Sequence, residues 1–103
     1  MEIIIIKVTF PNIEETKRVC TYLLQHKLIS SANYFPIKSI SSWTGSIKEV
    51  KEYIAFLKTK STNWEKVRDK IKEIHPYKIP CIIKINAEAN VDYKSWIISQ
   101  TQQ

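Results

Sequence analysis

The chain has 103 residues, of which 44% are hydrophobic and 25% charged, as is typical of one folded globular domain, here residues 1–103. Its single glycine, Gly45, excludes the glycine-rich loops that hold nucleotide phosphates. The formal net charge is +6, but the 16 lysines and arginines are mixed with ten acids. We therefore expect a solvated, lysine-rich surface and no nucleic-acid partner.

The N-terminal part predicts a strand followed by a helix. Residues 2–9 are β-branched almost throughout, which indicates a strand buried on both faces. This apolar run is too short for a signal peptide or a membrane span, so we expect a cytoplasmic protein without a membrane partner. Asn12 and Glu15 then form an N-cap pattern. Apolar residues follow at helical spacing: Ile13, Val19, Cys20, Leu23 and Leu24.

The middle of the chain predicts a long hairpin. Residues 28–42 and 47–60 show period-two patterning, and the turn between them, 43–46, contains Gly45, which adopts positive φ readily. Strands of this length exceed what the chain's own helices can cover, so we expect their ends to contact another subunit.

The C-terminal part predicts a helix, a strand and a last helix. A capping box of Thr62 and Glu65 opens an amphipathic helix that ends at His75, before Pro76. Residues 79–86 follow as a strand, and a short helix begins at Asn90. The order β-α-β-β-α-β is that of an α+β, ferredoxin-like antiparallel sheet with two helices on one face. The other face would stay apolar and largely bare, which oligomerisation would remedy.

His75 stands beside a rigid turn bounded by Pro76 and Pro80, and this turn also carries a phenol and an ammonium in Tyr77 and Lys78. Two interpretations remain open. An imidazole at the end of a helix can pack there and cap the last carbonyls, or it can serve as a metal ligand.

Several stretches resemble the CutA proteins, the divalent-cation tolerance family, over nearly the full length of the chain. The resemblance depends on the order and spacing of the following stretches: Thr9-Phe10-Pro11-Asn12, Lys27-Leu28-Ile29-Ser30-Ser31-Ala32-Asn33-Tyr34, Trp43-Thr44-Gly45, Leu57-Lys58-Thr59, His75-Pro76-Tyr77 and Ala89-Asn90-Val91-Asp92-Tyr93-Lys94-Ser95-Trp96.

The resemblance implies a ferredoxin-like protomer in a tight homotrimer of PII-like architecture, without enzymatic activity. It also implies a role in the response to divalent metals, copper especially. The chain departs from the family pattern at Ser31, where members often carry a cysteine, and at Lys78 and Cys81, where acids are usual. His75 and Cys81 remain as a candidate pair of ligands for Cu or another divalent metal. A purely structural role for Cys81, turned inward beside Pro80, is the alternative.

A second hypothesis assigns a ligand cleft between subunits. Its aromatic and basic residues would be Trp43, Lys58, Tyr77, Lys78, Tyr93 and Trp96. The lysines suit a small anionic ligand better than a cation, as in a PII-like sensor. The aromatic residues can equally be core or interface residues, which are common where subunits meet. A third hypothesis is a trimeric scaffold for a protein partner.

Overall fold

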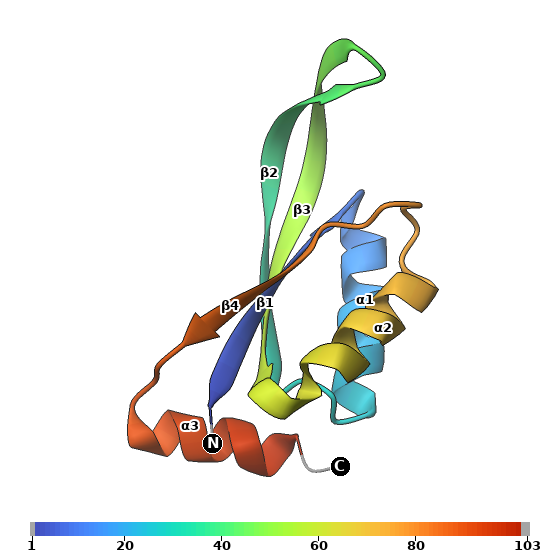
Figure 1. Ribbon diagram of the computed structural model, residues 1–103. Helices are drawn as coiled ribbons and strands as arrows, with labels where there is room; N and C mark the ends of the chain where they lie inside the picture. The colour runs from blue at the N-terminus through green and yellow to red at the C-terminus, as the bar shows by residue number, and fades with distance from the viewer. Residues whose placement is uncertain (1, 102–103) are drawn as a thin grey trace.

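The computed structural model describes residues 2–101 and has the predicted order of elements (Figure 1). The first elements along the chain are β1 (Ile3–Phe10), α1 (Ile13–Gln25), β2 (Ser31–Trp43) and β3 (Ser46–Lys60), followed by a 3-10 turn (Ser61–Asn63). The remaining elements are α2 (Trp64–Ile74), β4 (Ile82–Ala87) and α3 (Val91–Gln100).

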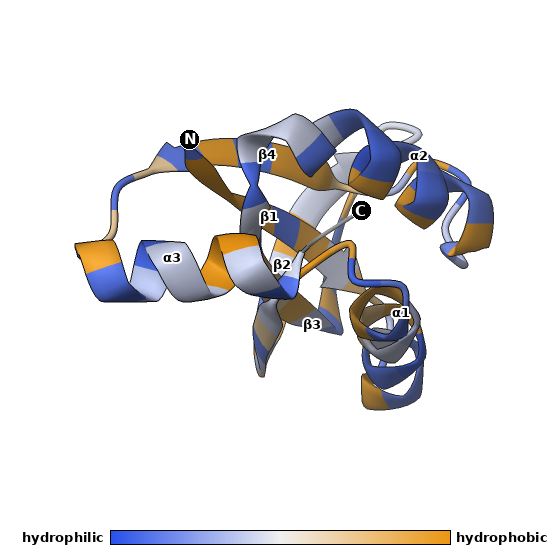
Figure 2. Cartoon of the chain, turned by 90° about the horizontal axis from the view of Figure 1, so that it is seen from below, coloured by the Kyte–Doolittle hydropathy of each residue, from blue (hydrophilic) through white to orange (hydrophobic). Residues whose placement is uncertain are grey.

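The four strands form one antiparallel sheet in the order β2-β3-β1-β4. Helices α1 and α2 lie together on one side of the sheet, and α3 lies on the other side (Figure 2). The predicted ferredoxin-like α+β fold is confirmed. No helix within residues 2–101 is long and apolar enough to cross a membrane.

The core lies between the sheet and the pair α1 and α2. Alternate residues of β1 point into it and are fully buried, and Ala55 and Leu57 of β3 lie beside them. The buried residues of β1 are Ile4, Ile6, Val8 and Phe10. The two helices cover the core on this face of the sheet, with Val19 and Leu23 of α1 and Val67 and Ile71 of α2. These residues follow the helical spacing of three and four that the sequence predicts.

The β2–β3 hairpin extends well beyond the rest of the sheet (Figure 1). The two strands pair from Ser31↔Lys58 to Trp43↔Ser46, whereas β1 accompanies β3 only as far as Tyr53. Thr44 and Gly45 both have positive φ, at 51° and 81°, which is the pattern of a type I′ turn. The apolar residues of the projecting part are exposed: Ile40, Trp43, Ile47 and Val50.

The predicted starts of two strands are wrong. Residues 28–30 are not part of β2, which begins at Ser31. Leu28, Ile29 and Ser30 are instead buried in the connection from α1 to the hairpin. Strand β4 begins at Ile82 rather than at residue 79, since the loop that carries Pro80 delays its pairing with β1.

The predicted capping box at the start of α2 is also wrong. The N-cap residue of this helix is Asn63, and within the described chain no side chain caps its first turn. The Asn63 side chain points inward instead and donates hydrogen bonds to Leu28 O at 3.2 Å and Thr59 Oγ1 at 3.1 Å.

Candidate functional site

His75 joins the end of α2 to β1. Its backbone N–H closes the last turn of the helix on Ile71 O at 2.8 Å, and its backbone then becomes extended, as the residue before a proline prefers. The ring is buried, with 8% of the residue exposed, and it stacks on Phe10 with 4.9 Å between ring centroids.

Both ring nitrogens of His75 have hydrogen-bond partners. Nε2 lies 2.8 Å from Thr9 O, and the Tyr77 N–H donates to Nδ1 at 3.0 Å. A carbonyl accepts and an N–H donates, so the pattern assigns a neutral ring protonated on Nε2. Burial lowers the pKa of His75 below its ordinary value. A metal at this ring would have to replace one of the two hydrogen bonds.

Tyr77 connects the same loop to the hairpin. Its hydroxyl donates to Glu52 Oε2 at 2.5 Å, and burial together with this bond raises the pKa of the phenol. Trp43, Tyr77, Lys78 and Ile79 line one apolar hollow of about 300 Å³. Three of the six predicted cleft residues therefore meet within one protomer.

Cys81 follows this loop directly before β4 and carries a free, half-buried thiol. Within residues 2–101, no three side chains of His, Cys, Asp or Glu lie together as a metal cluster. The other thiol, Cys20, is buried in the core, and burial raises its pKa to about 11. This thiol is protonated at neutral pH and poor as a ligand, as the helical pattern suggested.

The other three predicted cleft residues form a second group near α3. Tyr93 and Trp96 stack with 5.6 Å between centroids, and the Tyr93 hydroxyl lies 3.4 Å from Ser31 Oγ, whose register partner is Lys58. Lys58 lies six residues along β3 from Glu52, which corresponds to about 20 Å. One protomer thus separates the predicted cleft into two groups, and only an assembly could join them.

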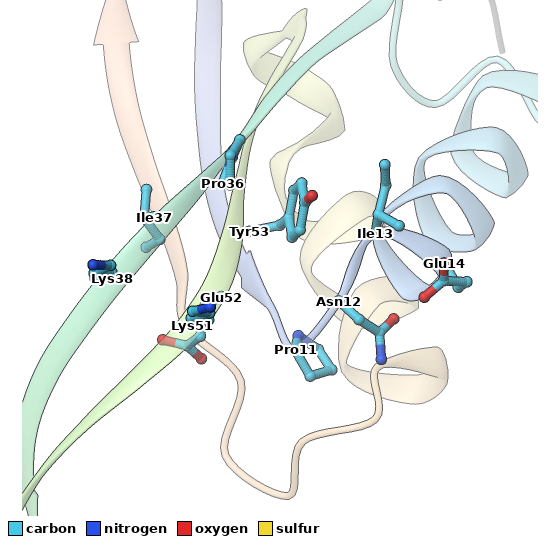
Figure 3. Close-up of a pocket in the computed structure, with 10 residues that line it drawn as sticks. All are labelled: Pro11, Asn12, Ile13, Glu14, Pro36, Ile37, Lys38, Lys51, Glu52 and Tyr53. Atoms are coloured by element: carbon cyan, nitrogen blue, oxygen red, sulfur yellow. The ribbon is translucent and has the colours of Figure 1, made fainter.

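A larger cavity lies at a place that the sequence patterns did not predict. It measures about 610 Å³ and lies between the start of α1 and the hairpin (Figure 3). Its lining combines two lysines with apolar residues from three separate elements, including Pro11, Ile13, Pro36 and Tyr53. The sequence alone marks Pro36 as an irregular position within a strand. Only the strand register shows that Pro36 lies opposite Tyr53, on the side of the cavity.

Comparisons with known proteins agree with this architecture. The model of the CutA1 divalent ion tolerance protein family matches residues 4–100. The divalent-cation tolerance protein CutA of Pyrococcus horikoshii is 41% identical over 101 residues, covering 97% of this chain and 99% of that protein. A crystal structure of CutA1 from the same organism superposes with a TM-score of 0.94 at 40% identity, over 97% of this chain and 99% of that one.

A second solved structure, the periplasmic divalent cation tolerance protein CutA from Archaeoglobus fulgidus, is 36% identical. It superposes with a TM-score of 0.94 over 97% of this chain and 99% of its own. The family model and these relatives span almost the whole chain, and they bear out the resemblance seen in the sequence. The chain therefore belongs to the CutA1 divalent ion tolerance protein family.

Proposed function

We propose that the chain acts as a homotrimer in the tolerance of divalent cations and binds copper or a similar cation weakly through His75 and Cys81. The observation that carries the metal proposal is the half-buried free thiol of Cys81 at the end of the loop that begins with His75. Thiolate and imidazole are ligands that copper and zinc prefer.

The weakness of binding follows from the contacts of His75. A cation at Nδ1 must displace the Tyr77 N–H, and one at Nε2 must leave the Thr9 carbonyl without its donor. Replacing such a hydrogen bond costs about 1 kcal/mol, and more when the orphaned group is buried. Two protein ligands also leave most of the coordination sphere to water or to a neighbouring subunit.

The homotrimer is supported by the far face of the sheet, meaning the face opposite α1 and α2. The register places a group of apolar residues on it, and α3 contributes the exposed Tyr93 and Trp96 beside them. This group includes Phe35, Ile54, Phe56, Ile83 and Ile85. An exposed apolar surface of this kind marks a protein interface.

Calorimetric titration of the purified protein with Cu(II) and Zn(II) tests the metal proposal. We expect a weak, saturable copper signal that is lost in His75→Ala and reduced in Cys81→Ser. The matched control is His26→Ala, which removes the only other histidine of the chain and should leave copper binding intact. Equal loss in both histidine variants, or no saturable signal in the wild type, contradicts the proposal.

The anion-sensor alternative is favoured by one observation, the hollow shared by Trp43, Tyr77 and Lys78. In a trimer, this group and the group of Lys58, Tyr93 and Trp96 could come from two subunits and close one cleft. Titration with adenine nucleotides in the absence of metal distinguishes the two functions. Nucleotide binding that becomes weaker in Lys78→Gln favours the sensor. A trimer that serves only as a scaffold binds neither metal nor nucleotide, and it retains a protein partner in a pull-down experiment.

A cytoplasmic location is part of the same proposal, since the two free thiols, Cys20 and Cys81, suit a reducing compartment. Cell fractionation with a tagged chain tests it, and recovery outside the cytoplasm would contradict it.

A further inference from the structure

The cavity between the start of α1 and the hairpin has the dimensions of a small-molecule site. Its volume of about 610 Å³ falls within the usual range for ligand pockets, roughly 300–1,000 Å³. Tyr53 projects from β3 toward Ile13 of α1 (Figure 3), and Pro11 and Pro36 complete an apolar surface around it. Flat rings and proline faces of this kind suit a planar apolar body.

Two lysines stand at the hairpin side of this surface. Lys38 and Lys51 are direct partners in the β2–β3 register, so their side chains leave the same face next to each other. Each lies two residues from an apolar lining residue, Pro36 or Tyr53, and therefore shares the face of the cavity. Both line the cavity.

The positive charges of this lysine pair lie opposite each other across the hairpin. None of the ion pairs among residues 2–101 includes Lys38 or Lys51, and like charges directly opposite each other destabilise an antiparallel pair. Two carboxylates also line the cavity. Glu52 already accepts the Tyr77 hydroxyl, and Glu14 belongs to the opposite wall, in the first turn of α1.

We propose that this cavity binds a small organic anion with a planar apolar or aromatic body. Its carboxylate, sulfonate or phosphate group would lie between Lys38 and Lys51 and relieve their repulsion, while its body would contact Tyr53, Pro36 and Ile13. The site is built by one protomer and shares no residue with the metal pair or with the six-residue cleft.

Titration of the full chain with 2-naphthoate, in the presence of EDTA, tests this site. We expect saturable binding, seen by calorimetry, with NMR shifts concentrated at the amides of residues 11–14, 36–38 and 51–53. The neutral probe 2-naphthamide has the same body without the charge and should bind about tenfold more weakly. Because EDTA removes metal, failure of the copper proposal leaves this experiment unaffected, and the reverse also holds.

Charge variants identify the lysine pair as the anchor. Lys38→Gln with Lys51→Gln should weaken naphthoate binding by about tenfold, and Glu14→Gln should strengthen it by about twofold, because the field at the cavity becomes more positive. The matched control is Lys48→Gln, which makes the same change on the same strand but on the opposite face of the hairpin.

A charge reversal separates binding from folding. Lys51→Glu places opposite charges in register with Lys38, so the melting temperature should stay equal or rise while naphthoate binding is lost. The proposal is overturned by an absence of saturable naphthoate binding, by equal affinity for the amide, or by an equal loss in Lys48→Gln. NMR shifts confined to other parts of the chain would overturn it as well.

Discussion

At the scale of single residues, His75 shows how far sequence reasoning reaches. The proline after it predicts the end of the helix, and the structure confirms that end. Its partners Thr9 and Phe10 could not be predicted, because they lie about 66 residues away in sequence and meet it only through the packing of α2 over β1. That packing engages Nε2 with Thr9 O, and the Tyr77 N–H of the following loop engages Nδ1, so His75 has a structural role even without a ligand.

The pH dependence of stability tests this role of His75. Burial holds its folded-state pKa below the ordinary 6.5, so in acid the unfolded chain binds more protons than the folded one. The free energy of unfolding should therefore be intact above about pH 6.5 and fall as the pH drops toward the folded-state pKa. Urea unfolding at fixed protein concentration, near neutrality and about one to two pH units lower, measures this.

Two histidine variants provide the control for this experiment. His75→Asn should lower stability at neutral pH and lose less on acidification than the wild type does. His26→Asn makes the same chemical change at an exposed residue and should retain the wild-type pH dependence. Identical acid sensitivity in all three proteins would show that His75 does not carry the effect.

At the scale of elements, the sequence predicted what depends on local patterns. The hairpin, its turn at residues 43–46 with positive φ at Gly45, and the helical stripes follow from period and turn chemistry. The start of α2 did not, because Thr62 and Glu65 fit a capping pattern equally well whether or not the backbone uses it. Tertiary contacts decided the outcome: Asn63 turns inward to bind the buried loop before β2.

This difference yields a paired prediction. Asn63 is 1% exposed, and Asn63→Ala removes its hydrogen bonds to Leu28 O and Thr59 Oγ1. We expect the variant to lose about 1–3 kcal/mol in the free energy of unfolding. Thr62→Ala should change it by less than about 0.5 kcal/mol. Chemical denaturation of both variants measures this. If Thr62→Ala loses more free energy of unfolding than Asn63→Ala, the helix does use the predicted capping box.

At the scale of the whole molecule, the protomer is elongated, with extents of 45 × 24 × 21 Å, because the hairpin projects beyond the core. The sequence predicted a bare sheet face from the count of helices. It could not divide the six cleft residues into two groups, since that division depends on the register of β3 and on where α3 lies. The cavity beside Tyr53 also escaped it, because its walls come from three separate elements.

The assembly gives the last prediction. If the far face holds subunits together, light scattering should find a particle of three 12.1 kDa chains, and unfolding should depend on protein concentration. Phe35→Asp and Ile83→Asp place charges on apolar side chains of that face, which are 43% and 45% exposed in the protomer. Burying an unpaired carboxylate in an interface is strongly unfavourable, so both variants should release smaller particles.

Leu24→Asp provides a closely matched control for the assembly, because Leu24 is 41% exposed but lies on α1, on the opposite side of the sheet. It introduces the same charge at the same degree of exposure and should leave the particle mass unchanged. A wild-type particle of one chain would contradict the homotrimer directly. Equal dissociation in all three variants would place the contact surface elsewhere than on the far face, and the apolar residues there would then need a different partner.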